Sequence, residues 1–171
     1  MNWRRESPLR LIAVDPGLQG TGVAIFKIGH PRPLHADVLR SHAGRKADWI
    51  DRVESIVEQV YELSVEYNVR HAVCEMMEMH QSPRAQMMWK SGDLQRTLFL
   101  VGSMHGQLTG SAGVVHFRVT PPSEWKGQLP KSVTINRINR LLGKGVGAEL
   151  GIQTHAWDAV GIGLWHMGFL K

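Results

Sequence analysis

The sequence predicts one α/β domain over residues 1–171, with a central five-stranded mixed sheet flanked by helices. Two observations support this fold class. Five short apolar segments occur along the chain, and longer segments between them repeat their apolar residues at helical spacing. The resulting order is three strands, a helix, a strand, a helix, a strand and two further helices, which is typical of a layered α/β fold. A length of 171 residues suits a single domain with a sizeable core.

The first three strands are predicted to form an antiparallel meander. Residues 9–14 are almost continuously apolar, as expected for a buried central strand. Residues 22–28 and 34–40 follow, and turn-forming residues such as Gly17 and Pro31 separate the three segments. Because these connections are short, neighbouring strands are expected to pair in antiparallel fashion.

Residues 47–68 are predicted to form an amphipathic helix. Its apolar residues share one face, whereas glutamates repeat every four residues on the opposite face. Like charges at that spacing repel, so the acidic face is expected to be solvated and to point away from nucleic acid. The segment holds six acidic residues and a single base, Arg52.

The second half of the chain alternates strands and helices. Strands are predicted over 70–75 and 114–119, and the helix over 93–108 between them implies that these two strands pair in parallel. That helix has four consecutive apolar residues at 98–101, so it is expected to be apolar on every side and to meet a second partner. Two further helices are predicted over 131–142, with a basic row beside its apolar face, and over 155–167.

Composition narrows the possible functions. The chain carries 20 Lys and Arg against 15 Asp and Glu, a net charge of +5, and much of the acidic charge is confined to 47–68. The remaining surface is therefore basic, which favours a polyanionic partner. Apolar runs are too short for a membrane span, and no secretory signal opens the sequence. The single cysteine, Cys74, excludes an internal disulfide and a cysteine-based zinc site, so a reducing, cytoplasmic setting is expected.

Three carboxylates are predicted to converge. Asp15 follows the first strand, Glu75 ends the fourth, and Asp158 lies one turn into the final helix. Neighbouring buried carboxylates repel each other unless a cation lies among them, and hard oxygen ligands suit Mg²⁺ or Mn²⁺. Glu78 is an alternative to Glu75, but in a continued strand it would face the opposite side. The pattern predicts a metal site that could hold two ions and hydrolyse a phosphodiester.

Three motifs carry a resemblance to a known family. LIAVDPGLQGTGVAIF, HAVCEMM and THAWDAVGIGLWH resemble the opening hairpin, the acidic fourth strand and the closing helix of the RuvC-type Holliday-junction resolvases. These enzymes belong to the ribonuclease-H-like (retroviral integrase) superfamily. The resemblance implies that Asp15, Glu75 and Asp158 bind metal and that His155 completes the catalytic set. His155 and Asp158 are three residues apart on the predicted helix and therefore share a face.

The resemblance also implies the activity and the partners. It implies a crossover junction endodeoxyribonuclease that cuts four-way or other branched DNA by paired nicks, with two Mg²⁺ ions per site and Mn²⁺ as a substitute. Symmetric nicks imply a homodimer, for which the helix over 93–108 is the expected interface. A short chain suggests similarity to phage-encoded members, and hence a bacterial or phage-infected host cytoplasm. Family members insert an aromatic wedge at the junction centre; Met88 or Trp89 is a candidate for this role, and core packing is an equally good interpretation of both. Basic residues before and along the helix over 131–142 are expected to contact DNA phosphates, namely Lys126, Lys131, Arg137, Arg140 and Lys144.

Other functions stay open at this stage. A YqgF-type nuclease of the same superfamily, acting on RNA, shares the opening hairpin. A non-catalytic DNA-binding module would keep the basic surface without the chemistry, but the acidic set is intact. An actin-like or sugar-kinase-like nucleotide binder also opens with an Asp-x-Gly hairpin, but such chains need two lobes and 171 residues supply one.

Overall fold

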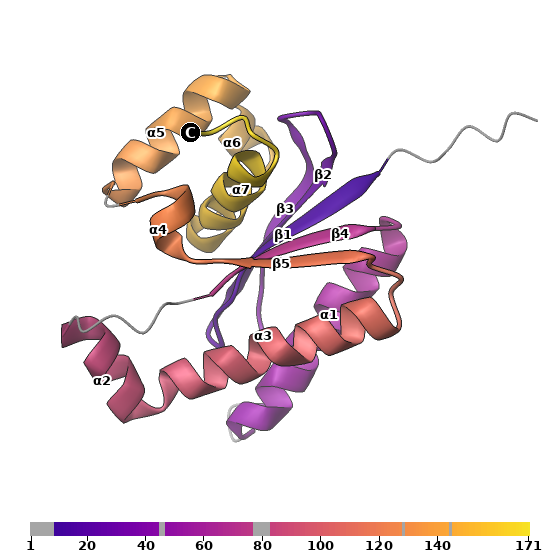
Figure 1. The fold of residues 1–171 in the computed structure, drawn as a ribbon, viewed down its shortest axis with the longest axis vertical. Coiled ribbons are helices and arrows are strands. Elements are labelled where there is room, and N and C mark those ends of the chain that lie inside the picture. The colour runs from indigo at the N-terminus through magenta and orange to yellow at the C-terminus, as the bar shows by residue number, and fades with distance from the viewer. Residues whose placement is uncertain (1–8, 45–46, 77–82, 128, 144) are drawn as a thin grey trace, which may run out of the picture.

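The computed structural model describes residues 9–44, 47–76, 83–127, 129–143 and 145–171, and its centre is a five-stranded sheet (Figure 1). The strand order is β3-β2-β1-β4-β5. The first three strands pair in antiparallel fashion, whereas β4 is parallel to β1 and β5 is parallel to β4. The predicted mixed sheet is thus confirmed. The strands are β1 (Arg10–Asp15), β2 (Thr21–Lys27), β3 (Pro33–Leu39), β4 (His71–Glu75) and β5 (His116–Thr120).

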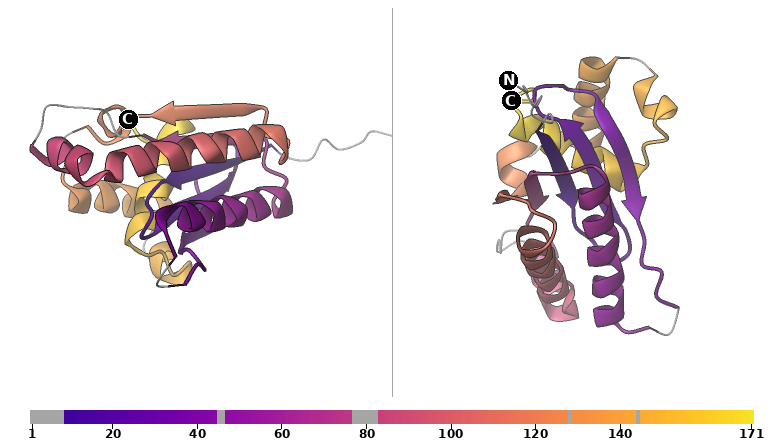
Figure 2. Two further views of the ribbon diagram at one scale, coloured as in Figure 1. Left: turned by 90° about the horizontal axis from the view of Figure 1, so that it is seen from below. Right: turned by 90° about the vertical axis from the view of Figure 1, so that its right-hand side faces the viewer.

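Helices cover both faces of the sheet. Figures 1 and 2 show α1 (Trp49–Glu66) and α3 (Asp93–Gly110) side by side on one face. The opposite face is covered by α7 (Thr154–His166), against which α5 (Lys131–Leu142) packs. Because side chains alternate along each strand, β1 contributes Ile12 and Val14 to one apolar core and Leu11 and Ala13 to the other. The sheet is therefore a middle layer, and its central strand is buried on both faces.

The acidic segment forms the predicted amphipathic helix, α1. Asp48 caps its N-terminus by accepting hydrogen bonds from the backbone of Ile50 and Asp51, and the Asp51 carboxylate accepts one from the Asp48 backbone in return. The buried side of the helix is formed by Val53, Ile56, Val60 and Ser64. The glutamates lie outside this face, as the four-residue spacing predicted.

Small residues bring α7 unusually close to the sheet. A Cβ atom at Gly163 would lie 2.4 Å from the Phe26 ring of β2, and one at Gly161 would lie 2.5 Å from the Trp125 ring. Neither position has room for a side chain. Most of α7 is buried, including Ala156, Ala159 and Leu164. Close packing of this kind fixes the position of the helix relative to β1 and β2.

Three short elements and one surface differ from the sequence-based prediction. The elements α2 (Pro83–Ser91), α4 (Pro122–Trp125) and α6 (Val146–Glu149) were not predicted. The expectation that the helix at 93–108 is apolar on every side is wrong. Leu98 and Phe99 are exposed on α3, but so are Gln95, Gly102 and His105, while α1 packs against its buried side. The run of four apolar residues overstated the apolar surface because Leu98 and Phe99 are followed one turn later by Gly102 and Ser103, so the exposed side does not continue as an apolar stripe.

Cys74 is buried in β4. It has no disulfide partner within the chain, because the sequence contains a single cysteine. Burial raises the pKa of its thiol well above the usual value, and the nearby Asp15 and Glu75 charges act in the same direction. The thiol is therefore a small packing group and not a nucleophile. Within the described ranges, no helix combines the length and apolar character that crossing a bilayer requires.

Candidate metal centre

Two carboxylates converge because β1 and β4 are adjacent parallel strands. Asp15 is the last residue of β1, and Glu75 is the last residue of β4. The carboxyl ends of parallel strands lie at the same edge of a sheet, and the alternation of side chains turns both residues toward α7. The sheet topology alone therefore brings two acids, separated by 60 positions in sequence, to one place.

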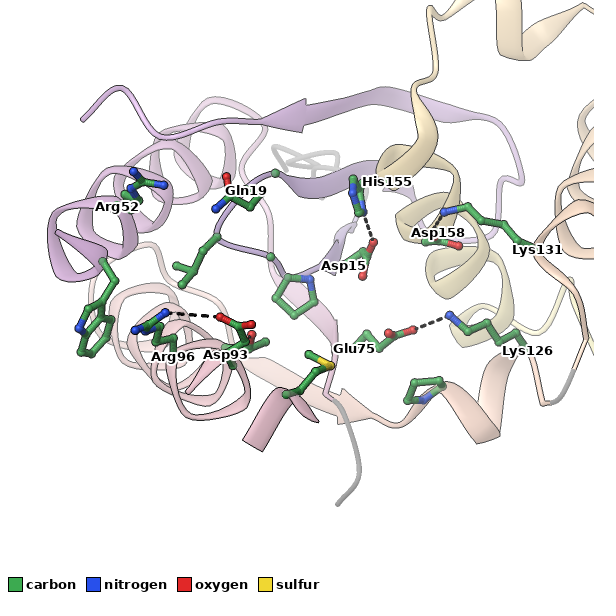
Figure 3. A pocket seen from close by; sticks show the side chains of 18 of the residues that line it. Asp15, Gln19, Arg52, Glu75, Asp93, Arg96, Lys126, Lys131, His155 and Asp158 are labelled. Atoms are coloured by element: carbon green, nitrogen blue, oxygen red, sulfur yellow. Dashed lines mark hydrogen bonds and ion pairs between the residues drawn. The ribbon is translucent and has the colours of Figure 1, made fainter. Parts of the chain in front are cut away.

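The first turns of α7 complete a cluster of three donors. His155 and Asp158 project from the same side of the helix, and the His155 Nδ1 atom lies 3.2 Å from Asp15 Oδ2 (Figure 3). One ligand atom from each of Asp15, His155 and Asp158 can be chosen so that all lie within 4.8 Å of one another. Three of the four predicted metal ligands are thus assembled around a single point.

Gly22 allows α7 to approach this closely. Gly22 lies opposite Asp15 in the β1–β2 pair, and a Cβ atom there would be 2.1 Å from the His155 backbone oxygen. The neighbouring turn is held by the Thr21 hydroxyl, which donates to the Gly17 carbonyl over 2.9 Å. From sequence alone, the glycines at 17, 20 and 22 fit either close approach of a ligand or the geometry of the turn. At Gly22 the approaching group is the backbone of α7 itself.

Glu75 lies in the same cavity but is bound differently. Its side chain is almost fully buried, and the Trp125 indole Nε1 donates a 2.6 Å hydrogen bond to Oε2. Burial raises the pKa of Glu75; the charge of Lys126, 3.5 Å from Oε2, works in the opposite direction. Glu75 is not a member of the three-donor cluster.

Two lysines neutralise part of the acidic charge. The Lys131 ammonium group pairs with Asp158, and Lys126 pairs with Glu75 while its Nζ lies 4.7 Å from the centre of the Trp125 ring. Both lysines were predicted to contact DNA phosphates. In the structure they pair with carboxylates at the edge of the cavity, where each ammonium group can bind either a carboxylate or a phosphate.

His155 is the polar group of the cluster most open to solvent. Its hydrogen bond to Asp15 raises the pKa of the imidazole, and burial acts in the opposite direction without reversing the shift. A protonated His155 and an anionic Asp15 stabilise each other, whereas a neutral imidazole would leave one nitrogen free to accept a proton or to bind a metal.

The donor set fits a divalent cation. Carboxylate oxygens are the preferred ligands of Mg²⁺, and an added imidazole nitrogen is well suited to Mn²⁺. Asp15 and Asp158 come from different elements, and their side chains are only 15 % and 13 % exposed. Partly buried acids this close need a positive partner, and the lysines supply one for Asp158 and one for Glu75.

The other predicted residues are placed as follows. Arg137 and Arg140 are exposed on α5, and neither lines the cavity that contains the cluster. Met88 lines this cavity, and Trp89 is 49 % exposed on α2. Lys144 and Glu78 lie outside the described residues.

The cavity, of about 990 Å³, extends well beyond the cluster. At its far end lie Arg52 of α1 and Arg96 of α3, neither of which was a predicted site residue. The one available sequence signal was that Arg52 is the single base on an otherwise acidic helix. The role of Trp125 as the hydrogen-bond donor to Glu75 was also missed, because the two residues are 50 positions apart and no local pattern indicates their contact.

Comparisons with known proteins give structural matches only. No protein-family model and no curated protein sequence matches the chain. RuvC of Thermus thermophilus aligns over 95 % of this chain and 99 % of its own, with a TM-score of 0.65 and 17 % identity. The same protein in complex with a Holliday junction substrate aligns over 95 % and 98 %, with a TM-score of 0.58 and 16 % identity. Ydc2, the yeast mitochondrial Holliday junction resolvase, aligns over 95 % of this chain and 78 % of its own, with a TM-score of 0.62 and 12 % identity.

These matches, with the strand order and the flanking helices, define the class as the ribonuclease-H-like α/β fold. Within this class the chain has the fold of the RuvC-type resolvases over almost its whole length. The fold resemblance inferred from the three sequence motifs is confirmed.

Proposed function

We propose that this protein is a metal-dependent endonuclease that cuts branched DNA and resolves four-way junctions by paired nicks. The observation that carries the proposal is the cluster of Asp15, His155 and Asp158, whose ligand atoms lie within 4.8 Å of one another. This cluster lies at the carboxyl edge of a RuvC-type sheet, with Glu75 beside it in the same cavity. The Holliday junction named in one structural match supports branched DNA as the substrate.

The residues of the site have separable roles in this proposal. Asp15, Asp158 and His155 would hold divalent cations, with Glu75 completing the set; two Mg²⁺ ions, replaceable by Mn²⁺, are proposed. Bound there, the cations would supply Lewis acidity to the phosphodiester and to the attacking water. In its neutral form, His155 can accept a proton or orient a water through the nitrogen that does not contact Asp15. As the DNA strand enters, Lys126 and Lys131 can exchange their carboxylate partners for phosphate groups.

Two further parts of the proposal concern binding. Arg137 and Arg140 on α5, together with Lys144, would contact phosphates outside the cavity, and each contact would steepen the salt dependence of binding. Paired nicks require two sites related by twofold symmetry, so the active form is proposed to be a homodimer in which the exposed part of α3 around Leu98 meets its counterpart. Sedimentation at several protein concentrations tests the dimer.

The decisive experiment compares Asp15→Asn with Asp37→Asn on a labelled four-way junction in Mg²⁺. Asp37 is exposed on β3 and does not line the cavity, so its variant controls for loss of an acidic charge. We expect Asp15→Asn to lower the cleavage rate at least about a hundredfold and to retain junction binding, because a metal ligand is removed while the basic surface is unchanged. Cleavage at the wild-type rate by Asp15→Asn would refute the proposal.

The alternatives are decided by the choice of substrate. A panel of four-way junctions, flaps, linear duplexes and structured RNA, each with and without Mg²⁺, separates a junction resolvase from a YqgF-type RNA nuclease. Cleavage of RNA alone would establish the second function. Binding of junctions without any cleavage across a titration of Mg²⁺ and Mn²⁺ would indicate a non-catalytic DNA-binding module.

A further inference from the structure

The end of the cavity away from Lys126 and Lys131 carries two arginines that the metal centre does not use. Figure 3 shows Arg52 and Arg96 on one side of Asp15, with Lys126 and Lys131 on the other. A cavity of about 990 Å³ is at the upper end of the range of roughly 300–1,000 Å³ typical of small-molecule sites. The donor cluster occupies one part of it, and the remainder is available to a longer ligand.

The acidic groups near these arginines are already engaged. Asp48 caps α1 by accepting hydrogen bonds of 2.7 and 3.0 Å from two backbone amides. Asp93 accepts a 2.7 Å hydrogen bond from the Ser91 hydroxyl and makes a longer, 3.4 Å contact with Arg96. Among the described residues, no hydrogen bond or ion pair joins Arg52 to a neighbour. The guanidinium of Arg52, and most of that of Arg96, is therefore free to bind an anion.

The position of Arg52 on α1 supports a binding role. The acidic face of this helix was expected to point away from nucleic acid, and Glu54, Glu58 and Glu62 do not line the cavity. The first turns of the helix do line it, through Asp48, Trp49 and Arg52. The only base of residues 47–68 is thus among the residues that line the cavity, whereas a purely solvated arginine could lie anywhere on the exposed face.

We propose that Arg52 and Arg96 form a phosphate subsite for the DNA strand that is cut, at a phosphate on one side of the scissile bond. This inference rests on the proposed nuclease function. In it, the strand passes along the cavity from Lys126 and Lys131, across Asp15 and Asp158, to the two arginines. Arginine suits this task because its planar donors bind phosphate oxygens in pairs. Contacts to phosphate would position the strand without reading its sequence.

The test measures DNA binding in an Asp15→Asn background, where cleavage does not interfere. The control for Arg52→Gln and Arg96→Gln is Lys27→Gln, which also removes one positive charge. Lys27 lies at one end of the β1–β2 pair, and Asp15 and Gly22 lie at the other. We expect each arginine variant to bind junction DNA roughly tenfold more weakly. The slope of log K against log salt concentration should become shallower by about 0.9 for each phosphate that the variant no longer neutralises. Lys27→Gln should change neither quantity.

A chemical probe assigns the contact to a phosphate. We prepare junctions that each carry one uncharged methylphosphonate, at successive positions around the cut site. Their affinities are measured for the Asp15→Asn parent and for Arg52→Gln in the same background. We expect one position at which the neutral linkage weakens binding by the parent and has no further effect on Arg52→Gln. Thermal unfolding of each variant checks that the fold is intact.

The outcomes separate the two proposals. If the wild-type protein neither binds nor cuts branched DNA, the proposed function fails. If it does both, but the two arginine variants match Lys27→Gln in affinity and salt slope, only the subsite is refuted. Additive effects of the methylphosphonate and Arg52→Gln at every position would also refute the subsite.

Discussion

Replacing Gly22 with alanine tests whether the contact between β2 and α7 sets the geometry of the proposed metal centre. The added Cβ would lie 2.1 Å from the His155 oxygen and 2.5 Å from the His155 carbonyl carbon. Carbon atoms in contact are normally about 3.5 Å apart, so the backbone at His155 has to retreat by about 1 Å. His155 and Asp158 move with this backbone, whereas Asp15 remains on β1.

The displacement is expected to affect activity more than folding. Overpacking of this size lowers the free energy of unfolding by about 1–3 kcal/mol, which a domain of this length can tolerate. A 1 Å error in the position of catalytic groups can lower the rate by about a hundredfold. The measurements are urea unfolding, Mn²⁺ affinity by calorimetry and the rate of junction cleavage. Gly44→Ala is the matched control, because a Cβ atom at Gly44 meets nothing within 4 Å.

The expected result is a folded Gly22→Ala protein with weakened Mn²⁺ binding and cleavage reduced by about two orders of magnitude, and a Gly44→Ala protein that resembles wild type. If Gly22→Ala binds Mn²⁺ and cuts junctions as the wild type does, the proposed dependence of the site on this backbone contact is wrong. Reduced cleavage that is fully explained by loss of folded protein would also contradict it.

Three further substitutions test the remaining groups. Burial raises the pKa of Glu75, so the free energy of unfolding falls as the pH rises from the ordinary carboxyl range through this raised pKa and the buried carboxyl group ionises. Without metal, Glu75→Gln should therefore melt at a higher temperature than the wild type above the raised pKa, and at a similar temperature below the ordinary carboxyl range. Equal melting temperatures at every pH would contradict this. His155→Ala should lower turnover in both Mg²⁺ and Mn²⁺, and unchanged rates in both would remove His155 from the site. Without metal, Lys131→Gln should lower the free energy of unfolding by up to about 1 kcal/mol, because Asp158 loses its ion-pair partner at a partly exposed position. Added Mn²⁺ should abolish this difference between the variant and the wild type. A difference that persists in saturating Mn²⁺ would show that Lys131 stabilises the protein through another contact.

The sheet and the convergence of the main candidate residues could be predicted from sequence because each depends on local pattern and chain order. An apolar run followed by Asp15, and a second ending in Glu75, are visible in the printed residues, and parallel pairing of β1 with β4 then places both acids at one edge. The spacing of His155 and Asp158 fixes their common face on any helix.

What could not be predicted depends on tertiary contacts between distant segments. The hydrogen bond from Trp125 to Glu75 spans 50 residues, and the pairing of Lys131 with Asp158 spans 27. Nothing local to either lysine distinguishes a carboxylate partner from a phosphate. The exposed side of α3 was misjudged for a different, local reason: Gln95, Gly102 and His105 lie beside Leu98 and Phe99 on the exposed side of the helix.

The distribution of the ligands along the chain affects how the protein is made. Asp15 and His155 contact each other across 140 positions, and α7 is the last helix in chain order. During synthesis the residues of all five strands leave the ribosome before the histidine and the aspartate that complete the cluster. If the proposed function holds, a polypeptide without α7 would therefore bind metal weakly and leave DNA intact. The proposed site is thus completed only when α7 has docked on the sheet.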